Sequence, residues 1–276
     1  NNMRKIHFIS GLPRAGSTML SAILRQNPRF TASMTDPMLD MSRGVIQTIQ
    51  GATGMEEFVT IEKRREIIAG MFQSYYSDAR EVCFNTNRGW AAHTPMIRNI
   101  WPNSKLILCV RDVPWILDSI ERINEKNPLT LKGVYGSQDL ISVYERTHTV
   151  MQIGGFVNAP LACTKQAIYS NEKDIICVID YDAITKNPEN VMRQLYAFLE
   201  EPYFNHDFDN VSENYDPAYV NFDNKLGMDG LHEVKKKVAP VNRKPILPED
   251  LWRMYADQSF WKSNFDHMKR QVKWIE

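Results

Sequence analysis

A glycine-containing loop near the N-terminus, in the stretch FISGLPRAGSTML at residues 8–20, constrains the fold more than any other feature of the sequence. An apolar run at residues 6–9 precedes the loop, which Gly11 and Gly16 bracket. Residues 17–26 follow with apolar side chains at helical spacing and stop at an Asn-Pro pair. A strand, a tight loop and a helix in this order are the repeating unit of α/β proteins.

Further apolar runs extend this pattern along the chain. The expected buried strands cover residues 5–10, 81–85, 105–110 and 174–180. These runs are continuous rather than alternating, which is typical of parallel strands covered on both faces. Helical patterns at 17–26, 56–76, 115–124 and 188–199 separate the strands.

The order of these elements predicts a single α/β domain over residues 1–276, with a central parallel sheet flanked by helices. Three long segments rich in Met, Tyr, Phe and Asn fall between the predicted elements. We expect these segments, at about 30–60, 129–170 and 201–248, to be insertions that build a pocket or a lid.

The charge balance and the cysteines exclude several classes of protein. Lys and Arg together number 33, as do Asp and Glu, so no net field steers the chain to nucleic acid. No apolar run approaches the length of a membrane-spanning helix, and no apolar signal region opens the sequence. The four cysteines form no C-x-x-C pair, and the histidines show no metal-ligand spacing. We therefore expect a cytoplasmic protein with reduced thiols and no metal.

The N-terminal loop has the composition of an anion site. Backbone N–H groups of a glycine-containing turn that enters a helix bind phosphate-like groups, and Ser17 and Thr18 add hydroxyl donors. Arg14 adds a planar guanidinium suited to phosphate or sulfate oxygens. In a P-loop a lysine follows the second glycine, whereas here Ser17 follows Gly16 directly. The missing lysine argues against magnesium-dependent use of a triphosphate, and a plain packing turn is the alternative for the loop alone.

A second polar cluster stands at the end of another predicted strand. In CVRDVPWILDS, Arg111 ends the apolar run and Ser119 follows eight residues later, about two turns into the next helix. This pair would grip a second phosphate, although an Arg-Asp sequence after a strand is commonly a surface ion pair. Because ligands of such sheets bind beyond the carboxyl ends of the strands, we expect the two clusters to meet there.

Together the two clusters resemble the sulfotransferases that use 3′-phosphoadenosine-5′-phosphosulfate (PAPS). GLPRAGSTML is similar to that family's 5′-phosphosulfate loop, and VRDVPWILDS is similar to its 3′-phosphate element. A third match is YDAITKNPENVMRQLYAFLE, with Ile184 where the family has leucine, and the matches fall in order over roughly residues 6–200. The resemblance implies a P-loop-like α/β fold, PAPS as the sulfuryl donor, the nucleotide PAP as the product, and no metal.

The resemblance also implies which residues bind the donor. The 5′-phosphosulfate would lie on the loop, with Arg14 near its bridging oxygen, and the loop residues are Pro13, Arg14, Ala15, Gly16, Ser17 and Thr18. Arg111 and Ser119 would bind the 3′-phosphate, and Tyr181 would approach the adenine. A basic C-terminal segment often closes over the 3′-phosphate in the family. The stretch EVKKKVAPVNRKP offers Arg243 or Lys244 for that role, or is simply a solvated basic run.

Two residues compete for the role of general base. His93 leads, because its HTP sequence keeps the His-x-Pro of a family segment, while Ala91-Ala92 replace the Lys-Thr of that segment. We therefore expect Arg88 to stabilise the transferred group in place of the missing lysine. Asp36, in SMTDPM, is the rival, since some relatives use a carboxylate that follows the first helix. The simpler interpretations are that His93 packs against its neighbours or caps a helix, and that Asp36 forms a turn before proline.

The sequence thus predicts an enzyme that moves a sulfuryl group from PAPS to a hydroxyl or amine, by in-line transfer with a general base. A degenerate P-loop kinase that uses ATP and magnesium is the alternative, and a non-catalytic binding module is the third possibility. The acceptor stays open among a small molecule, a carbohydrate, a peptide tyrosine and a carrier-bound group, with no nucleic acid and no membrane insertion. No match to the short dimerisation motif of cytosolic relatives is present, so the oligomeric state stays open.

Overall fold

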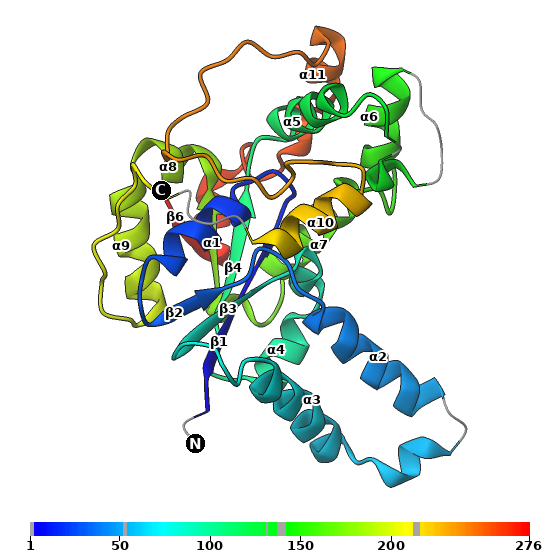
Figure 1. The fold of residues 1–276 in the computed structure, drawn as a ribbon, viewed down its shortest axis with the longest axis vertical. Coiled ribbons are helices and arrows are strands. Elements are labelled where there is room, and N and C mark those ends of the chain that lie inside the picture. The colour runs from blue at the N-terminus through cyan, green and yellow to red at the C-terminus, as the bar shows by residue number, and fades with distance from the viewer. Residues whose placement is uncertain (1–2, 52–53, 131, 137–141, 212–215) are drawn as a thin grey trace.

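The computed structural model describes residues 3–51, 54–130, 132–136, 142–211 and 216–276. In these ranges one parallel sheet runs through the molecule with strand order β2-β3-β1-β4-β5-β6. Helices lie on both sides of the sheet (Figure 1). The predicted fold class, a central parallel sheet flanked by helices, is confirmed.

The strands are β1 (Lys5–Gly11), β2 (Phe30–Ala32), β3 (Val82–Thr86), β4 (Leu106–Val110), β5 (Ile176–Asp180) and β6 (Lys273–Ile275). The four strands expected from the sequence correspond to β1, β3, β4 and β5. β1 lies between β3 and β4, with Lys5 opposite Val82 and Phe8 opposite Leu106. Because β3, β4 and most of β1 and β5 are buried, their sequences are continuous apolar runs rather than alternating ones.

The two outer strands, β2 and β6, were not predicted. Each has three residues, which is too short for a period to show, and only the pairing with β3 and β5 identifies them as strands. The segment at 30–60, expected as an insertion, therefore begins with a strand of the sheet.

The helices include the four expected at 17–26, 56–76, 115–124 and 188–199, and the rest were not predicted. They are α1 (Ser17–Arg25), α2 (Met38–Gly51), α3 (Ile61–Tyr75), α4 (Thr94–Ile100), α5 (Val113–Lys126), α6 (Val143–Met151), α7 (Asn158–Ile168), α8 (Tyr181–Lys186), α9 (Pro188–Leu199), α10 (Pro217–Lys225), α11 (Glu249–Tyr255) and α12 (Phe265–Gln271). The helix expected at 56–76 starts later, because the Thr60 hydroxyl accepts a hydrogen bond from the Lys63 N–H and so caps α3. The helix expected at 115–124 starts earlier, with Pro114 in its first turn.

The carboxyl ends of the strands all face the same side of the molecule. The N-terminus lies at the bottom of Figure 1, so the strands run upward, and α10 crosses above their ends. α2 and α3 extend away from the sheet at the lower right of the same view. Helix α10, within the segment at 201–248, therefore covers the edge where ligands of such sheets bind.

Candidate active site

The N-terminal loop is held against β4 by a close backbone approach. Gly11 has a φ of 107°, and a Cβ there would lie 2.2 Å from the carbonyl oxygen of Cys109. The N–H of the next residue, Leu12, donates to that same oxygen at 2.8 Å. This contact turns the chain away from the sheet at the end of β1 and sets the start of the loop.

The end of the loop leaves the first turn of α1 uncapped. Gly16 is the N-cap residue, with a left-handed φ of 95°, and no described side chain caps the helix. The N–H groups of Ser17 and Thr18 therefore stay available at a helix N-terminus, where the helix dipole favours an anion. The loop has the geometry of an anion site, as its sequence predicted.

Arg14 joins this loop to two distant parts of the chain. Its Nε donates to Oγ of Ser119 on α5 at 3.0 Å, and its Nη1 donates to the carbonyl oxygen of Leu231 at 2.6 Å. Burial, followed by the nearby Arg111 charge, lowers the pKa of Arg14 to about 10. The guanidinium therefore keeps its charge at neutral pH.

Arg111 brings the second predicted cluster to the same place. Its Nη1 donates to the carbonyl oxygen of Arg14 at 3.0 Å, and its Cζ lies 4.0 Å from the centre of the Tyr181 ring. Burial lowers the pKa of Arg111. Arg14, Arg111, Ser119 and Tyr181 thus form one contact cluster at the ends of β1, β4 and β5.

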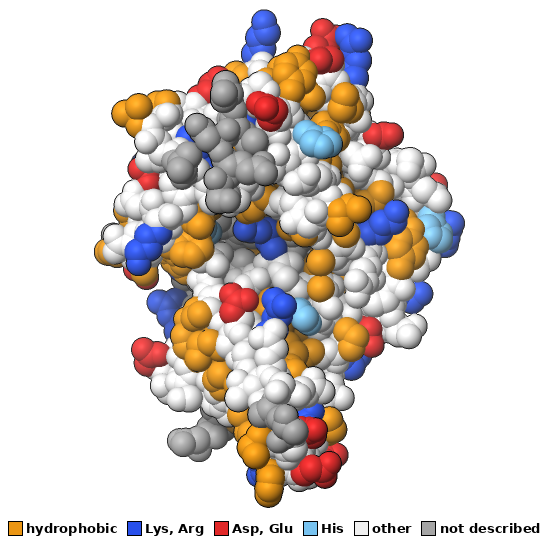
Figure 2. Space-filling view, turned by 90° about the vertical axis from the view of Figure 1, so that its right-hand side faces the viewer, with side chains coloured by type: hydrophobic (Ala, Val, Ile, Leu, Met, Phe, Trp, Pro, Cys, Tyr) orange, Lys and Arg blue, Asp and Glu red, His pale blue; other side chains and the backbone are white. Residues whose placement is uncertain are grey.

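A cavity of about 970 Å³ opens over this cluster, between the strand ends and the segment that carries α10. Figure 2 shows a hollow near the middle of one face of the molecule, with basic side chains inside it. The predicted site residues that line the cavity are Pro13, Arg14, Gly16, Ser17, Thr18, Asp36, Arg88, Arg111, Tyr181 and Arg243. Ala15 belongs to the loop but is buried and does not line the cavity. Ser119 contacts the cluster through Arg14.

His93 does not line this cavity. A 3₁₀ turn at Arg88–Ala92 follows β3 and buries Trp90, whose Nε1 donates to Oδ1 of Asn85 at 2.8 Å. This turn carries the chain past the strand end, so that His93 stands half-buried at the start of α4. Burial, and then the charge of Arg43, lower the pKa of His93.

Asp36 lines the cavity from the loop before α2. Its Oδ2 accepts hydrogen bonds from Ser33 Oγ and Asn85 Nδ2, both at 2.7 Å, and from the Tyr76 hydroxyl at 3.3 Å. Its Oδ1 accepts from the backbone N–H of Met38 at 3.0 Å. Burial raises the pKa of Asp36, against the opposing effect of these four donors.

Arg88 is a cation without an acidic partner in the described part of the chain. It lines the cavity, and its Cζ lies 4.7 Å from the centre of the Phe156 ring. Burial lowers the pKa of Arg88 to about 10, so the charge remains at neutral pH. A desolvated guanidinium of this kind favours an anion in the cavity.

The C-terminal basic segment is fixed to α5 beside Ser119. Oδ1 of Asp118 accepts from the backbone N–H groups of Ile246 and Leu247 at 2.6 and 3.1 Å, and Oδ2 accepts from Arg243 Nη2 at 3.2 Å. Arg243 lines the cavity, whereas Lys244 is exposed and is not among the lining residues.

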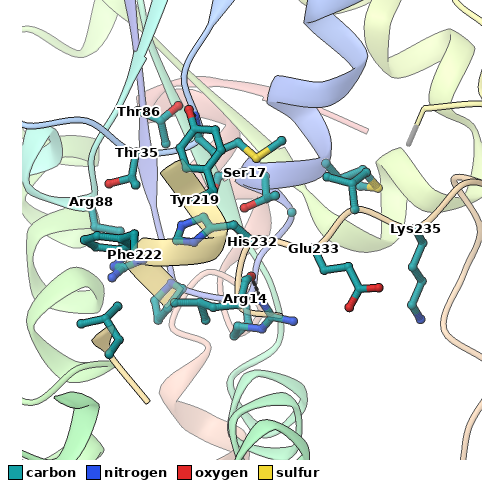
Figure 3. Close-up of a pocket in the computed structure, with 18 of the residues that line it drawn as sticks. Arg14, Ser17, Thr35, Thr86, Arg88, Tyr219, Phe222, His232, Glu233 and Lys235 are labelled. Carbon is teal, nitrogen blue, oxygen red and sulfur yellow. Dashed lines mark hydrogen bonds between the residues drawn. The ribbon is translucent and has the colours of Figure 1, made fainter. Parts of the chain in front are cut away.

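Several lining residues were missed by the sequence analysis. Lys235 and Lys237 belong to the basic stretch that was singled out, so that run was their signal. Tyr219 and Phe222 on α10 and His232 after it stand in no motif, and nothing in the sequence placed them over the loop (Figure 3).

Three properties of the described residues bear on function more generally. They contain no group of three or more His, Cys, Asp and Glu side chains placed to hold a metal ion. No helix among them has the length and apolar character needed to cross a bilayer. Within the same residues the four cysteines are unbridged, and burial raises the pKa of each thiol.

Comparison with known proteins agrees with this geometry. The model of the family described as "Sulfotransferase family" matches residues 7–205. A protein of Caenorhabditis briggsae named "Putative protein-tyrosine sulfotransferase" is 23% identical over 209 residues, which are 74% of this chain and 68% of the relative.

Solved structures share the fold at low identity. The sulfotransferase of Alicyclobacillus acidocaldarius has a TM-score of 0.53 at 14% identity, with 80% of this chain and 90% of that one covered. The sulfotransferase domain of the curacin biosynthetic pathway has a TM-score of 0.52 at 16% identity, with 94% and 99% covered. Since the family match spans most of the chain, the resemblance read from the loop and strand-end motifs is confirmed: this chain belongs to the sulfotransferase family.

Proposed function

We propose that this protein transfers the sulfuryl group of PAPS to a hydroxyl or amine of an acceptor. The observation that carries the proposal is the hydrogen bond between Arg14 and Ser119, which lie 105 residues apart. It joins the loop expected to bind the 5′-phosphosulfate to the element expected to bind the 3′-phosphate. A ligand with anionic groups on both the 3′ and the 5′ position of a nucleoside fits this pairing better than one with a single phosphate chain.

The donor would be held by residues from each strand end. The open N–H groups at the start of α1 and the hydroxyls of Ser17 and Thr18 would bind the 5′-phosphosulfate. Arg111, stacked on Tyr181, and Ser119 would bind the 3′-phosphate, with Tyr181 also approaching the adenine. Arg243, fixed beside Ser119 through Asp118, would close over the 3′-phosphate in preference to Lys244.

The reaction breaks the bond between sulfur and the bridging oxygen while the acceptor attacks sulfur from the opposite side. Negative charge grows on the leaving 5′-phosphate, where the loop amides and Arg14 stand. Preorganised cations and N–H donors at such a position stabilise the transition state more than the ground state. Arg88, which lines the cavity and packs on Phe156, would stabilise the sulfuryl oxygens during transfer.

Of the two bases suggested by the sequence, Asp36 is the better placed to meet an acceptor. It lines the cavity and has a raised pKa, whereas His93 is outside the cavity lining. The name of the Caenorhabditis briggsae relative supports a peptide tyrosine as the first acceptor to assay. The aromatic wall formed by Phe156, Tyr219 and Phe222 is compatible with a phenol.

Binding of PAP tests the proposed donor site. Thermal unfolding is followed with PAP, with AMP, and with ATP plus magnesium, for the wild type, Arg111→Ala and the control Arg193→Ala on the exposed face of α9. A ligand at one hundred times its dissociation constant stabilises by about 2.7 kcal/mol. We expect PAP to raise the melting temperature of the wild type and the control without metal, and to have a much smaller effect on Arg111→Ala.

The nucleotide specificity decides between the candidate enzymes. If AMP raised the melting temperature as much as PAP does, the argument for a 3′-phosphate site would be removed. A shift only with ATP and magnesium would move the protein to the kinase alternative. Labelled PAPS and a tyrosine-containing peptide then test transfer itself.

A further inference from the structure

A histidine and an aspartate on the segment above the strand ends form a buried pair that the sequence motifs do not include. Asp223 lies near the end of α10, and its carboxylate is 1% exposed. Oδ1 of Asp223 lies 2.5 Å from Nδ1 of His232, and Oδ2 accepts from the His232 backbone N–H at 2.8 Å. Because a carboxylate only accepts, Nδ1 carries the hydrogen, and Nε2 is the basic nitrogen of the neutral ring.

The His232 ring is also fixed by its packing. It stacks on Tyr219, with ring centres 5.8 Å apart and planes at 29°, and it contacts Phe222 at the same distance. Figure 3 shows the ring beside Tyr219 and Phe222, with Arg14 nearby. The bond from Nδ1 to the carboxylate and the two aromatic neighbours leave the imidazole little rotational freedom, and the backbone N–H bond fixes the residue itself to Asp223.

The position of His232 is tied to the loop expected to hold the donor. Leu231, the residue before it, accepts the hydrogen bond from Arg14 Nη1 at 2.6 Å. His232 lines the same cavity as Arg14, Ser17 and Arg88. Since Arg14 reaches from the loop to the residue next to His232, the imidazole stands close to the place where the sulfuryl group would be transferred.

The two possible bases of the cavity differ in how their lone pairs are used. Four donors already hold the Asp36 carboxylate. Nε2 of His232 has no hydrogen-bond partner within the described ranges. An imidazole oriented by a carboxylate, with its second nitrogen open to the substrate, is the arrangement by which enzymes activate weak nucleophiles.

We propose that His232, oriented by Asp223, is the catalytic base of sulfuryl transfer, an inference that rests on the proposed function. As the acceptor oxygen forms its bond to sulfur, the bond between sulfur and the bridging oxygen breaks, and PAP leaves with that electron pair. The acceptor proton moves to Nε2, and the Asp223 carboxylate stabilises the imidazolium. Asp36 then serves as a fixed part of the cavity wall.

The experiment compares two phenols that differ in their need for a base. 4-Nitrophenol at pH 8 is already largely ionised, whereas N-acetyltyrosinamide keeps its proton. With PAPS as donor, we expect His232→Ala to lower kcat for N-acetyltyrosinamide by about 10²- to 10⁴-fold, the range of general base catalysis. Transfer to 4-nitrophenolate should change less than about threefold. If the wild type sulfates neither phenol, the release of PAP by sulfuryl transfer to water is measured instead. His232→Ala must then lower that rate by a similar factor.

Two further variants separate a catalytic from a structural effect. Asp223→Asn retains the size of the side chain and should lower transfer to N-acetyltyrosinamide selectively, by about tenfold. Added imidazole should restore part of the activity of His232→Ala. His148→Ala, on the exposed face of α6, is the matched control and should behave as the wild type.

Binding of PAP keeps the two proposals distinguishable. Wild-type and His232→Ala proteins should bind PAP equally, because the ring is not assigned to the donor. If the wild type did not bind PAP, the proposed function itself would be overturned. Normal PAP binding with both phenols slowed equally, or with neither slowed, would overturn only the role of His232. If Asp36→Asn, rather than His232→Ala, selectively lost transfer to N-acetyltyrosinamide, Asp36 would be the base that takes the acceptor proton.

Discussion

Gly11 shows how a single missing side chain fixes the position of the loop. Its φ of 107° suits glycine, and a Cβ would meet the backbone of Cys109 at 2.2 Å, with no flexible side chain to move aside. We expect Gly11→Ala to lower the free energy of unfolding by at least about 2 kcal/mol, since left-handed strain alone costs about 1–2 kcal/mol. Urea unfolding measures the change.

Gly70 provides a control of opposite sign for that substitution. It lies inside α3, and a Cβ there would meet nothing within 4 Å. Gly70→Ala should therefore raise the free energy of unfolding by about 0.5–1 kcal/mol, because alanine is the better helix former. Equal effects of the two substitutions would show that the approach of Gly11 to β4 is unimportant.

Residues near the strand ends also show where sequence reasoning succeeds. Arg14, Arg111 and Tyr181 follow apolar runs that predicted parallel strands, and parallel strands bring their carboxyl ends to one edge. His93 stands after such a run too, but the turn that buries Trp90 takes it away from the cavity. Spacing along a sequence gives the distance from a strand end, whereas the direction of the chain beyond it depends on packing.

At the scale of elements, α5 supports both sides of the cavity. One of its residues, Ser119, contacts the loop through Arg14, and the preceding residue, Asp118, holds the C-terminal basic segment. The pKa of Asp118 is lowered by its N–H donors and by Arg122, although burial opposes them. Two adjacent residues of one helix thus connect segments more than a hundred residues apart.

Removal of the Asp118 carboxylate should release the C-terminal segment. In Asp118→Ala the N–H groups of Ile246 and Leu247 lose their acceptor, and an unpaired buried donor costs about 1–3 kcal/mol. We expect faster amide exchange at Ile246 and Leu247 and binding of PAP weakened by about tenfold. Arg243→Ala, which removes the basic side chain and leaves the Asp118 carboxylate in place, should weaken PAP binding without speeding exchange at Leu247. Unchanged exchange in Asp118→Ala would mean that other contacts hold the segment.

The elements that the sequence did not reveal are those defined by long-range contacts. β2 and β6 are strands only because β3 and β5 lie beside them. α10 carries few buried residues of its own, and its importance comes from its place above the strand ends. A pair such as Asp223 and His232, nine positions apart with the end of α10 and an irregular connection between them, leaves no period or motif by which it could be predicted.

At the scale of the whole molecule, the net charge and the local charge differ. The chain is neutral overall, yet Arg14, Arg88, Arg111 and Arg243 line one cavity together with two lysines. Because the chain carries no net charge, an anionic ligand depends on the local placement of cations such as these. The absence of a net positive charge on the whole chain avoids general attraction to polyanions, so specificity rests on the arrangement of these groups.

Acid stability is a second property of the whole molecule, and it depends on His7 in the centre of the sheet. Its Nδ1 accepts from the backbone N–H of Lys105 at 3.0 Å, and the side chain is 1% exposed. Burial, and then the charges of Lys5 and Lys105, lower the pKa of His7 to about 3. The folded protein therefore binds fewer protons than the unfolded chain between about pH 6.5 and pH 3.

The sign of the resulting pH dependence follows from linkage. A histidine whose pKa is lowered by folding contributes full stability above its unfolded pKa, and that stability falls as the pH falls through the window. Each pH unit within it costs about 1.4 kcal/mol per such group, so His7 should remove about 2 kcal/mol between pH 6.5 and pH 5. His206, with its pKa lowered to about 4 by burial, should add to the loss.

Urea unfolding at pH 7, 6 and 5 measures this loss in the wild type and in His7→Asn. The amide cannot titrate, and its oxygen can accept from the Lys105 N–H in place of Nδ1. We expect His7→Asn to be less stable than the wild type at pH 7, because the smaller side chain leaves space in the sheet's packing, yet to lose about 2 kcal/mol less on acidification to pH 5. Parallel stability curves for the two proteins would mean that His7 gains a proton in the folded state as easily as in the unfolded chain, and the acid sensitivity would then belong to other groups.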